Sequence, residues 1–361
     1  MNVAPRVSVV VATYDRPASI ERLVLQLGQQ DVAADAYEIV VVDDGSREAA
    51  APRLERLSLP CALTVLTQEN AGAARARHRG IEAARGELVV VVDDDIQIGP
   101  DFLARHLDAH AAGARKAVLG RLRLDPARSF PLFERNHGRV LERLAREILS
   151  GRRQLVGSNL YTGNVSFRRG DYFAVGGFDP SLRLSEDAEL GIRLEKAGVA
   201  LCFSDAAGAW HSSDHTSVRA WMRRAFEYGI WDLRIARKHP DLAAASPWRF
   251  LFQVSPVSRP WLLASATAPA LGTLLAWPAM AVALGLDRLG WERLAHAGAT
   301  FAYGLEYFRG MRVEAGSLSA TVGGLRRYLR QRRGEGLRRA ARARTARFAG
   351  QAERNVGVRP N

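Results

Sequence analysis

Three consecutive aspartates, Asp93, Asp94 and Asp95, directly follow an apolar run that begins at Leu88. An uninterrupted apolar run of this length is typical of a strand buried on both faces of a parallel sheet. The carboxylates would then lie at the carboxyl end of the strand, where open α/β sheets bind ligands. Because adjacent anions repel one another, we expect a cation here, and Mg²⁺ or Mn²⁺ bridging to a phosphate suits oxygen ligands. The alternative interpretation is a solvated charged loop.

The spacing within this cluster gives a D-x-D pattern at Asp93 and Asp95. On an extended chain, alternate side chains point the same way, so these two could share one cation. A second pair of acids, Asp43 and Asp44, ends another apolar run, and the Asp-Gly-Ser sequence that follows also suits a plain turn.

A third acidic group, Glu186 and Asp187, follows Ser185 at the start of a predicted helix. Acids stabilise the first turn of a helix, so helix capping alone would favour them at this position. His211, near the end of a later apolar segment, is explained equally well as a satisfied surface histidine or as a functional residue, and His215 competes with it for any functional role.

Strand and helix patterns alternate through the first half of the chain. The predicted strands are residues 7–12, 38–43, 61–66 and 88–93, and the predicted helices between and after them are residues 18–29, 72–84 and 102–112. This rhythm predicts an α/β fold with a parallel, doubly wound sheet. The second half is mixed: strands are expected at 117–124 and 199–203, and helices at 131–151, 186–197 and 217–239.

Motifs in the first 240 residues, taken in order, resemble family 2 glycosyltransferases, which have the GT-A fold. The nucleotide-binding half of that family is similar to residues 7–16, 41–46, 69–77 and 92–95, and its acceptor half to Gly163-Asn164, residues 176–179 and residues 185–187. The resemblance covers about two thirds of the chain. It implies a donor-binding half at 1–120 and an acceptor half at 121–240.

The resemblance also implies roles for individual residues. Asp93 and Asp95 would hold a divalent metal, Mn²⁺ or Mg²⁺, that neutralises the diphosphate of a nucleotide-sugar, with Asp94 reaching the ribose or the donor sugar. Asp44 would contact the base, and Tyr14 could stack on it. In some members of the family a histidine near His211 completes the metal site.

Two further assignments concern positive and acidic side chains after the donor motifs. Arg75 is expected near the phosphates or the donor sugar, and Arg77 is a weaker choice for that position. The resemblance makes an acid near residue 187 the general base: Asp187 is the first choice and Glu186 the alternative. One base without a second nucleophile predicts inversion at the anomeric carbon. The Gln-x-x-Arg-Trp motif of processive synthases is absent, which favours transfer of a single sugar.

The positive charge of the chain is concentrated at its end. The formal net charge is +13, and from Leu325 onward twelve arginines oppose two glutamates, which leaves +3 for everything before. Such a tail suits an anionic membrane surface or nucleic acid, or it is a solvated terminus; of the two partners we expect the membrane. Two distant cysteines favour a reducing compartment, and we recognise no signal peptide.

An apolar region precedes this tail. Residues 261–286 form a run of 26 residues without a charge, long enough to cross a bilayer, although Pro269 and Pro278 interrupt it. Residues 294–311 form a weaker apolar segment. We therefore expect membrane-associated helices at 247–311, either spanning or re-entrant, and an arginine-rich tail at 312–361. A buried core helix and a hydrophobic oligomer interface are the alternatives.

Taken together, the sequence predicts an inverting, metal-dependent glycosyltransferase. Its donor would be a UDP- or GDP-sugar, and its acceptor a hydroxyl of a lipid-linked or cell-envelope glycan at the cytosolic membrane face. The competing functions are a sugar-1-phosphate nucleotidyltransferase and a non-catalytic nucleotide-sugar-binding protein. The first is disfavoured because residues 12–17 lack a glycine-rich phosphate loop, and a dinucleotide-binding protein is disfavoured because no G-x-G-x-x-G follows the first strand.

Overall fold

A computed structural model describes residues 4–111, 113–211 and 217–334. Contacts divide the chain into two units, one made of Met1–Arg224 with Pro278–Thr300 and the other of Ala225–Trp277 with Phe301–Asn361. The domain limits expected from the sequence remain a prediction.

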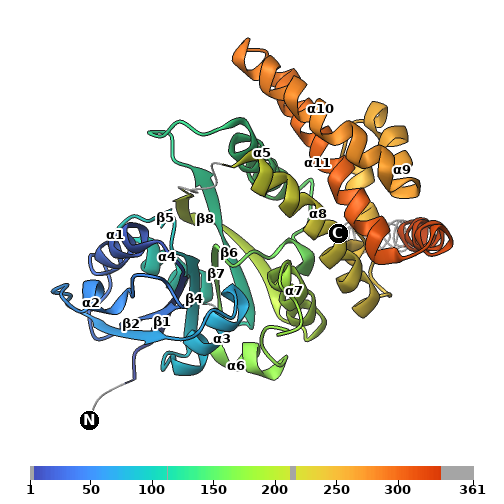
Figure 1. The fold of residues 1–361 in the computed structure, drawn as a ribbon. Coiled ribbons are helices and arrows are strands. Elements are labelled where there is room, and N and C mark those ends of the chain that lie inside the picture. The colour runs from blue at the N-terminus through green and yellow to red at the C-terminus, as the bar shows by residue number, and fades with distance from the viewer. Residues whose placement is uncertain (1–3, 112, 212–216, 335–361) are drawn as a thin grey trace, which may run out of the picture. The chain divides into compact units, whose positions relative to one another are not determined.

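The first unit is built on a sheet in which, among the described residues, eight strands run in the order β3-β2-β1-β4-β7-β6-β8-β5 (Figure 1). The strands are β1 (Val7–Thr13), β2 (Tyr37–Asp43), β3 (Ala62–Thr67), β4 (Leu88–Asp93), β5 (Ile96–Gln97), β6 (Lys116–Leu124), β7 (Asn164–Arg168) and β8 (Ala200–His211). Strands β1 to β4 are mutually parallel, β7 is antiparallel to β4 and β6, and β6 and β8 are parallel. The predicted parallel sheet is therefore correct for the first half, and the complete sheet is mixed.

The register brings the ends of the central strands to one edge. Thr13 pairs with Asp43, and Ala12 pairs with Asp93, so that β1, β2 and β4 end side by side. Loops leaving all three strands therefore start from the same edge. This places the acids predicted from separate motifs within one region.

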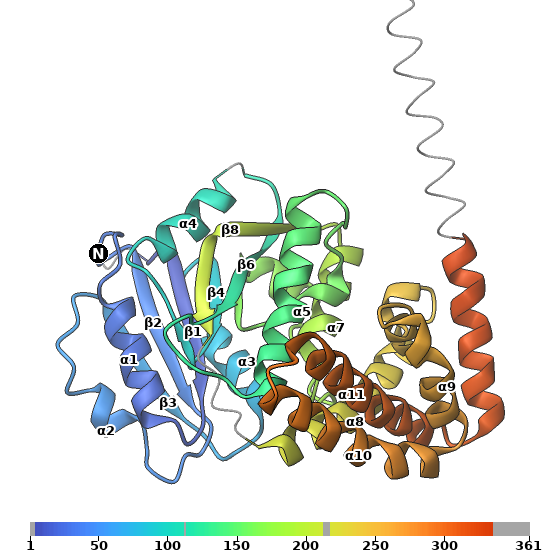
Figure 2. The same ribbon diagram turned by 90° about the horizontal axis from the view of Figure 1, so that it is seen from above.

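Helices cover both faces of the sheet (Figures 1 and 2). They are α1 (Pro17–Leu27), α2 (Ala51–Leu54), α3 (Ala73–Ala83), α4 (Phe102–His110), α5 (Leu132–Leu149), α6 (Arg169–Ala174) and α7 (Glu186–Lys196), with a 3-10 turn at Gly157–Asn159. Alternate residues of β1 face opposite layers: Val9 and Val11 belong to the core that includes Leu23 of α1, and Val10 belongs to the core that includes Ile81 of α3. Burial on both faces explains why this strand is mostly apolar, and its buried Ser8 is satisfied by donating to Glu38 Oε1 at 2.6 Å.

Strand β8 is longer than the sequence pattern indicated. Residues 199–203 were expected as a separate short strand, but β8 runs from Ala200 to His211, with an irregularity in its pairing to β6 between Gly120 and Leu122. Pairing of Leu124 with His211 keeps the strand extended to its end. The added length brings His211 to the edge where β4 ends.

The C-terminal region is helical. After α8 (Val218–Lys238) come 3-10 segments at Ala243–Ala245, Pro247–Phe252 and Pro256–Ser258, then α9 (Arg259–Thr267), α10 (Pro269–Arg288) and α11 (Glu292–Ala315), and residues 318–334 are also helical. The uncharged run is thus divided between α9 and α10. The division falls at Ala268, whose φ of −128° and ψ of 86° leave the helical region directly before Pro269. Pro278 lies inside α10 without ending it.

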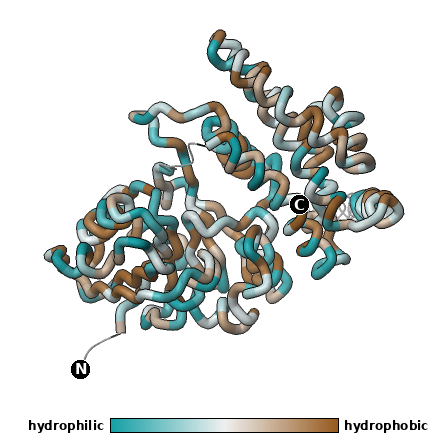
Figure 3. The backbone as a smooth tube through the Cα atoms, viewed as in Figure 1, coloured by the Kyte–Doolittle hydropathy of each residue, from teal (hydrophilic) through white to brown (hydrophobic). Residues whose placement is uncertain are grey.

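Helix α10 is the one helix of the described chain that is long and apolar enough to cross a membrane by length and composition. Apolar residues recur along it in the hydropathy view (Figure 3). Only 22% of its apolar window is buried. Small or slender residues, Gly272, Ala276, Met280 and Ala283, form its buried side, while Leu274 and Trp277 are exposed.

Candidate functional site: an acid and arginine cluster at the sheet edge

The side chains of the three aspartates at the end of β4 do not all point toward the same partner. Asp93 is the last residue of the strand, and the chain turns at Asp94 and Asp95 before β5. The extended geometry expected through Asp95 is therefore wrong. Asp93 contacts one arginine, Arg77, whereas Asp94 and Asp95 both contact another, Arg16.

Arg16 follows β1 and reaches across the sheet edge to β4. Its Nη1 lies 2.9 Å from Asp94 Oδ1 and 2.7 Å from Asp95 Oδ2. Thr13 Oγ1 donates a hydrogen bond of 2.6 Å to the other oxygen of Asp94. Burial raises the pKa of Asp94 to about 6, although Arg16 and Thr13 act in the opposite direction.

Arg77 joins the aspartate cluster to the third acidic group. The buried guanidinium donates from Nη2 to Asp93 Oδ1 at 2.6 Å and from Nη1 to Glu186 Oε1 at 3.0 Å. Helix α3 supplies this side chain, and α7 begins at Glu186. Arg77 therefore fixes the start of α7 beside the end of β4. A charge-assisted pair on each side makes it the structural bridge of the site.

Asp187 follows Glu186 in α7 and is partly exposed. Burial and the nearby carboxylate of Glu186 raise the pKa of Asp187 to about 7, although the Ala188 N–H and Arg77 act in the opposite direction. Ser185, the N-cap residue, has a left-handed backbone (φ 59°) and makes no capping hydrogen bond with its side chain. The first turn of α7 contains three acids, Glu186, Asp187 and Glu189. Asp187 Oδ1 accepts from Ala188 N at 2.7 Å, so stabilisation of the helix start accounts for part of this acidic group. Glu186 is held by Arg77, whereas Asp187 is not in contact with that guanidinium.

His211 Nε2 lies 3.2 Å from Asp95 Oδ1. Burial alone would raise the pKa of Asp95, but His211 and Arg16 hold it well below its usual range. Burial alone would lower the pKa of His211, and contact with Asp95 raises it instead. The structure thus brings His211 to the acid cluster, as predicted. His215, the competing histidine, lies outside the described residues.

The metal prediction can be tested against this donor set. Among the described residues, no three side chains of His, Cys, Asp or Glu are grouped around one point that suits a metal. Asp95 Oδ1 is nevertheless buried without a well-aligned hydrogen-bond donor, and His211 Nε2 is its neighbour. An oxygen and an imidazole nitrogen suit Mn²⁺, whose remaining ligands could be phosphate oxygens and water. Asp95 and His211 therefore fit the metal, while Asp93 is turned toward Arg77.

The residues predicted to contact the nucleotide base and phosphates differ from the aspartate cluster in their partners. Asp44 is buried and its carboxylate accepts hydrogen bonds from Gln68 Nε2 (2.7 Å), Ala71 N (2.9 Å) and Gly72 N (2.8 Å). These contacts shape the loop before α3. Tyr14 is 48% exposed at the same edge, and Arg75 is exposed on α3. Their contacts with a nucleotide remain predictions.

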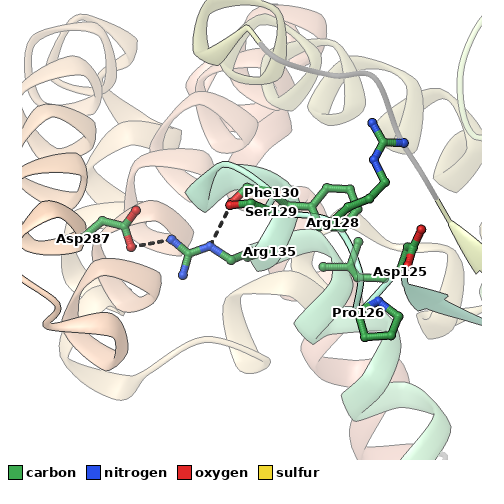
Figure 4. A pocket seen from close by; sticks show the side chains of 8 residues that line it. Asp125, Pro126, Arg128, Ser129, Phe130, Arg135 and Asp287 are labelled. Carbon is green, nitrogen blue, oxygen red and sulfur yellow. Dashed lines mark hydrogen bonds and ion pairs between the residues drawn. The ribbon is translucent and has the colours of Figure 1, made fainter.

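A separate hollow of about 570 Å³ lies near the end of β6 (Figure 4). It is lined by Leu124, Asp125, Pro126, Arg128, Ser129, Phe130, Arg135 and Asp287. Arg135 closes one side by pairing with Asp287 at 2.5 Å. Because Leu124 pairs with His211, the hollow opens at the end of the strand that carries the histidine.

Sequence reasoning missed Thr13 and Arg16 and gave Arg77 too little weight as a contact of the acids. One signal was available for the first two, because both lie where the first strand ends and β1 and β4 end at the same edge. Arg77 is one of several arginines in its helix, and only the packing of α3 against the start of α7 distinguishes it.

Known proteins are similar to this chain in sequence and in architecture. Residues 8–173 match Glycosyl transferase family 2. Validoxylamine A glucosyltransferase of Streptomyces hygroscopicus subsp. jinggangensis is 30% identical over 275 residues, covering 68% of this chain and 63% of that protein. An undecaprenyl-phosphate 4-deoxy-4-formamido-L-arabinose transferase of Pseudomonas aeruginosa is 34% identical over 117 residues, covering 30% and 33%. The chain spans 63% and 59% of the length of two Streptomyces relatives.

Solved structures agree in fold. The mannosyltransferase PcManGT from Pyrobaculum calidifontis, in complex with GDP-Man and Mn²⁺, has a TM-score of 0.55 at 23% identity, covering 83% of this chain and 86% of that chain. TarS 1–349 of S. aureus, in complex with UDP-GlcNAc, has a TM-score of 0.51 at 16% identity, covering 82% and 90%. Residues 8–173 of this chain are thus similar to glycosyl transferase family 2, and the mostly parallel sheet with flanking helices is the GT-A fold.

Proposed function

We propose that the chain transfers a single sugar from a nucleoside-diphosphate sugar, UDP- or GDP-linked, to a hydroxyl group, with inversion at the anomeric carbon. The observation that carries the proposal is Asp187. It is a partly exposed acid whose pKa is raised to about 7, within electrostatic reach of Arg77 and Asp93 at the ligand-binding edge of the sheet. A carboxyl group with such a pKa suits proton transfer near neutral pH.

The donor would lie along the edge formed by β1, β2 and β4. Tyr14 and Asp44 are at the end of the edge expected to face the base, and the aspartate cluster is at the phosphate end. Similarity to the family supports a nucleotide-sugar, and GDP-Man and UDP-GlcNAc occupy PcManGT and TarS. The arginines support the phosphate assignment because guanidinium groups bind phosphate oxygens in a bidentate manner.

A divalent metal, when bound, would neutralise charge that develops on the leaving diphosphate. Asp95 and His211 would hold it, and Asp93 would join them only by giving up Arg77. PcManGT contains Mn²⁺, which supports this choice of ion. Asp187 would take the proton of the acceptor hydroxyl while Arg77 and Glu186 keep the start of α7 in place. A single base acting on the acceptor is the arrangement that a direct, inverting displacement requires.

The acceptor is proposed to be lipid-linked or an envelope glycan at the cytosolic membrane face. The Pseudomonas relative is named for undecaprenyl phosphate, which supports a lipid acceptor. Helix α10 exposes Leu271, Leu274 and Trp277, and apolar and aromatic side chains of this kind suit the membrane interface. Replacement of Leu274 with Glu should reduce pelleting of the full-length protein with anionic vesicles; unchanged pelleting would contradict the membrane assignment of α10.

The decisive experiment is Asp187→Asn in the full-length protein. Transfer should fall by about a thousand-fold or more because the general base is lost, while Mn²⁺-dependent binding of the nucleotide should change little. Glu189→Gln is a matched control, since that acid pairs with Arg193 on the same helix and has no proposed role. Turnover of Asp187→Asn at the wild-type rate would remove Asp187 as the base.

The products separate the competing functions. A glycosyltransferase releases a nucleoside diphosphate, whereas a sugar-1-phosphate nucleotidyltransferase forms or consumes pyrophosphate. Incubation of purified protein with Mn²⁺ and a panel of nucleotide-sugars, followed by chromatography of the nucleotides, distinguishes the two. A protein that binds the sugar nucleotides but releases no diphosphate with any acceptor tested would favour the non-catalytic alternative.

A further inference from the structure

Arg16 occupies the two aspartates that a metal and a donor would need. One nitrogen, Nη1, lies within 2.9 Å of Asp94 Oδ1 and 2.7 Å of Asp95 Oδ2. The other oxygen of Asp94 accepts from Thr13. Asp94 is therefore fully engaged by the protein, and Asp95 keeps only Oδ1, the oxygen beside His211.

The loop after β1 is built to hold Arg16 in this position. Asp15 has a left-handed backbone with φ 52°, which non-glycine residues rarely adopt. Its N–H donates to Ser46 Oγ at 2.9 Å, and its carboxylate accepts from Arg47 N at 2.8 Å and Arg47 Nε at 2.9 Å. Pro17 then begins α1. Fixed contacts on both sides of Arg16 thus direct its side chain back over the sheet edge.

A guanidinium and a divalent cation compete for the same acids. The Arg16 side chain is 27% exposed and the Asp95 side chain only 5% exposed, so water screens this pair weakly. Two cations that share one carboxylate at such a depth repel each other strongly. A metal therefore binds Asp95 most tightly when Arg16 has moved away. The Arg16 side chain is partly exposed, so it can move into solvent.

We propose that Arg16 is the resident counter-ion of the aspartate cluster and that it makes metal binding depend on the donor. In the donor-free protein Arg16 neutralises Asp94 and Asp95, so a divalent ion binds weakly. When a nucleoside diphosphate arrives, its phosphates offer Arg16 an alternative anionic partner, and Asp95 becomes free for the metal. Arg16 is then a positioning and phosphate-binding residue. The inference rests on the proposed function, because it assigns the ligand of the same site.

Mn²⁺ binding tests the proposal without any measurement of turnover. Free Mn²⁺ is titrated by electron paramagnetic resonance against full-length wild type and Arg16→Gln, first alone and then with UDP or GDP. In Arg16→Gln the affinity for Mn²⁺ alone should rise about ten-fold or more, because a competing unit charge has been removed. The gain in Mn²⁺ affinity on adding nucleotide should shrink correspondingly. Unchanged or weaker binding of Mn²⁺ alone would overturn the proposal.

Arg105→Gln is the matched control. It removes the same charge from helix α4, where the side chain is 47% exposed and pairs with Asp101 four residues earlier instead of with the cluster. Its Mn²⁺ affinity should stay within about two-fold of wild type because solvent screens it. An equal rise in both variants would show a general charge effect and would overturn the specific role of Arg16.

A second variant covers the case in which Arg16→Gln does not fold. Arg16→Lys keeps the charge on a shorter, more flexible side chain whose ammonium is more strongly hydrated than the guanidinium, so its hold on Asp94 and Asp95 should weaken and Mn²⁺ alone should bind about three-fold more tightly. No change in the lysine variant would then overturn the proposal. If wild type binds neither UDP nor GDP with Mn²⁺, the proposed function fails, whereas the metal-only titrations still decide the role of Arg16.

Discussion

Two polar clusters on neighbouring strands of one sheet differ in charge and in access to solvent. The cluster that follows β4 contains more carboxylates than arginines, and Asp93 keeps 32% of its side chain exposed. The other lies between α4 and β7, where His106, Asn164 and Ser166 are completely buried. Strand β7 pairs directly with β4, so backbone position alone does not separate the clusters. The comparison teaches that unbalanced, accessible charge distinguishes a site from a polar core.

The buried cluster forms a chain of hydrogen bonds that assigns every proton. Asn164 Nδ2 donates to Ala207 O at 2.8 Å, so its Oδ1 accepts from His106 Nε2 at 3.0 Å. His106 Nδ1 must then accept from Ser166 Oγ at 2.8 Å, and Ser166 Oγ accepts from His110 Nε2 at 2.9 Å. Both histidines are neutral in this arrangement. Within it, His106, Asn164 and Ser166 satisfy one another without a ligand, whereas His110 Nδ1 is buried without a hydrogen-bond partner in the described part of the chain.

The acid cluster behaves differently because its charges are not balanced within the chain. Arg16 and Arg77 each contact two carboxylates, and Asp95 Oδ1 is left without a well-aligned donor. Unbalanced and partly accessible charge of this kind suits the binding of an external ion or ligand. Substitutions in the acid cluster should therefore change ligand binding and turnover, whereas substitutions in the buried network should change stability.

After the loss expected from Asp187→Asn, the largest expected effect comes from Asp95→Ala. Removal of the carboxylate beside His211 should lower kcat/KM about a hundred-fold or more, because metal stabilisation of the leaving group contributes several kcal/mol. The loss should appear as weaker Mn²⁺ dependence of donor binding, measured by calorimetry. The free energy of unfolding should fall far less than the activity. An unchanged Mn²⁺ dependence would exclude Asp95 as a metal ligand.

A smaller effect should appear in the pH dependence of stability. Burial lowers the pKa of His106 to about 4. The folded state therefore favours neutral His106, and its contribution is complete above the unfolded pKa of about 6.5 and is lost as pH falls toward 4, for a total of about 3 kcal/mol. Protonation of Asp94 and Asp187, whose pKa values are raised, acts in the opposite direction over the same range.

The comparison of variants isolates the histidine from these acids. Urea unfolding of wild type and His106→Asn should give stability curves whose difference shrinks between pH 6.5 and pH 4, because the variant has no imidazole to protonate. In proteins that also carry Asp187→Asn, the free energy of unfolding should fall more steeply toward acid pH, because protonation of Asp187 no longer offsets that of His106. A difference between wild type and His106→Asn that stays constant with pH would show that His106 is not held neutral by the fold.

Particular residues show how much could be predicted from the sequence. The central strands and the position of Asp93 at their edge could be predicted, because burial on both faces makes parallel strands mostly apolar and their ends meet at one edge. The parts of Asp187 and His211 in the site were expected only from the family resemblance. The partners of the acids could not be predicted. The position of Arg16 depends on a left-handed backbone at Asp15, and the direction of Asp95 depends on a turn that replaces the expected extension. Such loop conformations follow from tertiary contacts and leave no periodic pattern.

The smallest expected effect is the pH dependence of turnover, and it sharpens the contrast between the clusters. Asp187 must be ionised to accept a proton, and its pKa is raised to about 7. The acidic side of the kcat/KM profile should therefore fall about ten-fold per pH unit below that value, while the rate levels off above it. Between pH 6.5 and pH 8 the contribution of His106 to stability is constant, so loss of folded protein does not imitate the effect. A kcat/KM that stays flat from pH 8 to pH 6, measured under saturating Mn²⁺, would mean that the proton goes to another group.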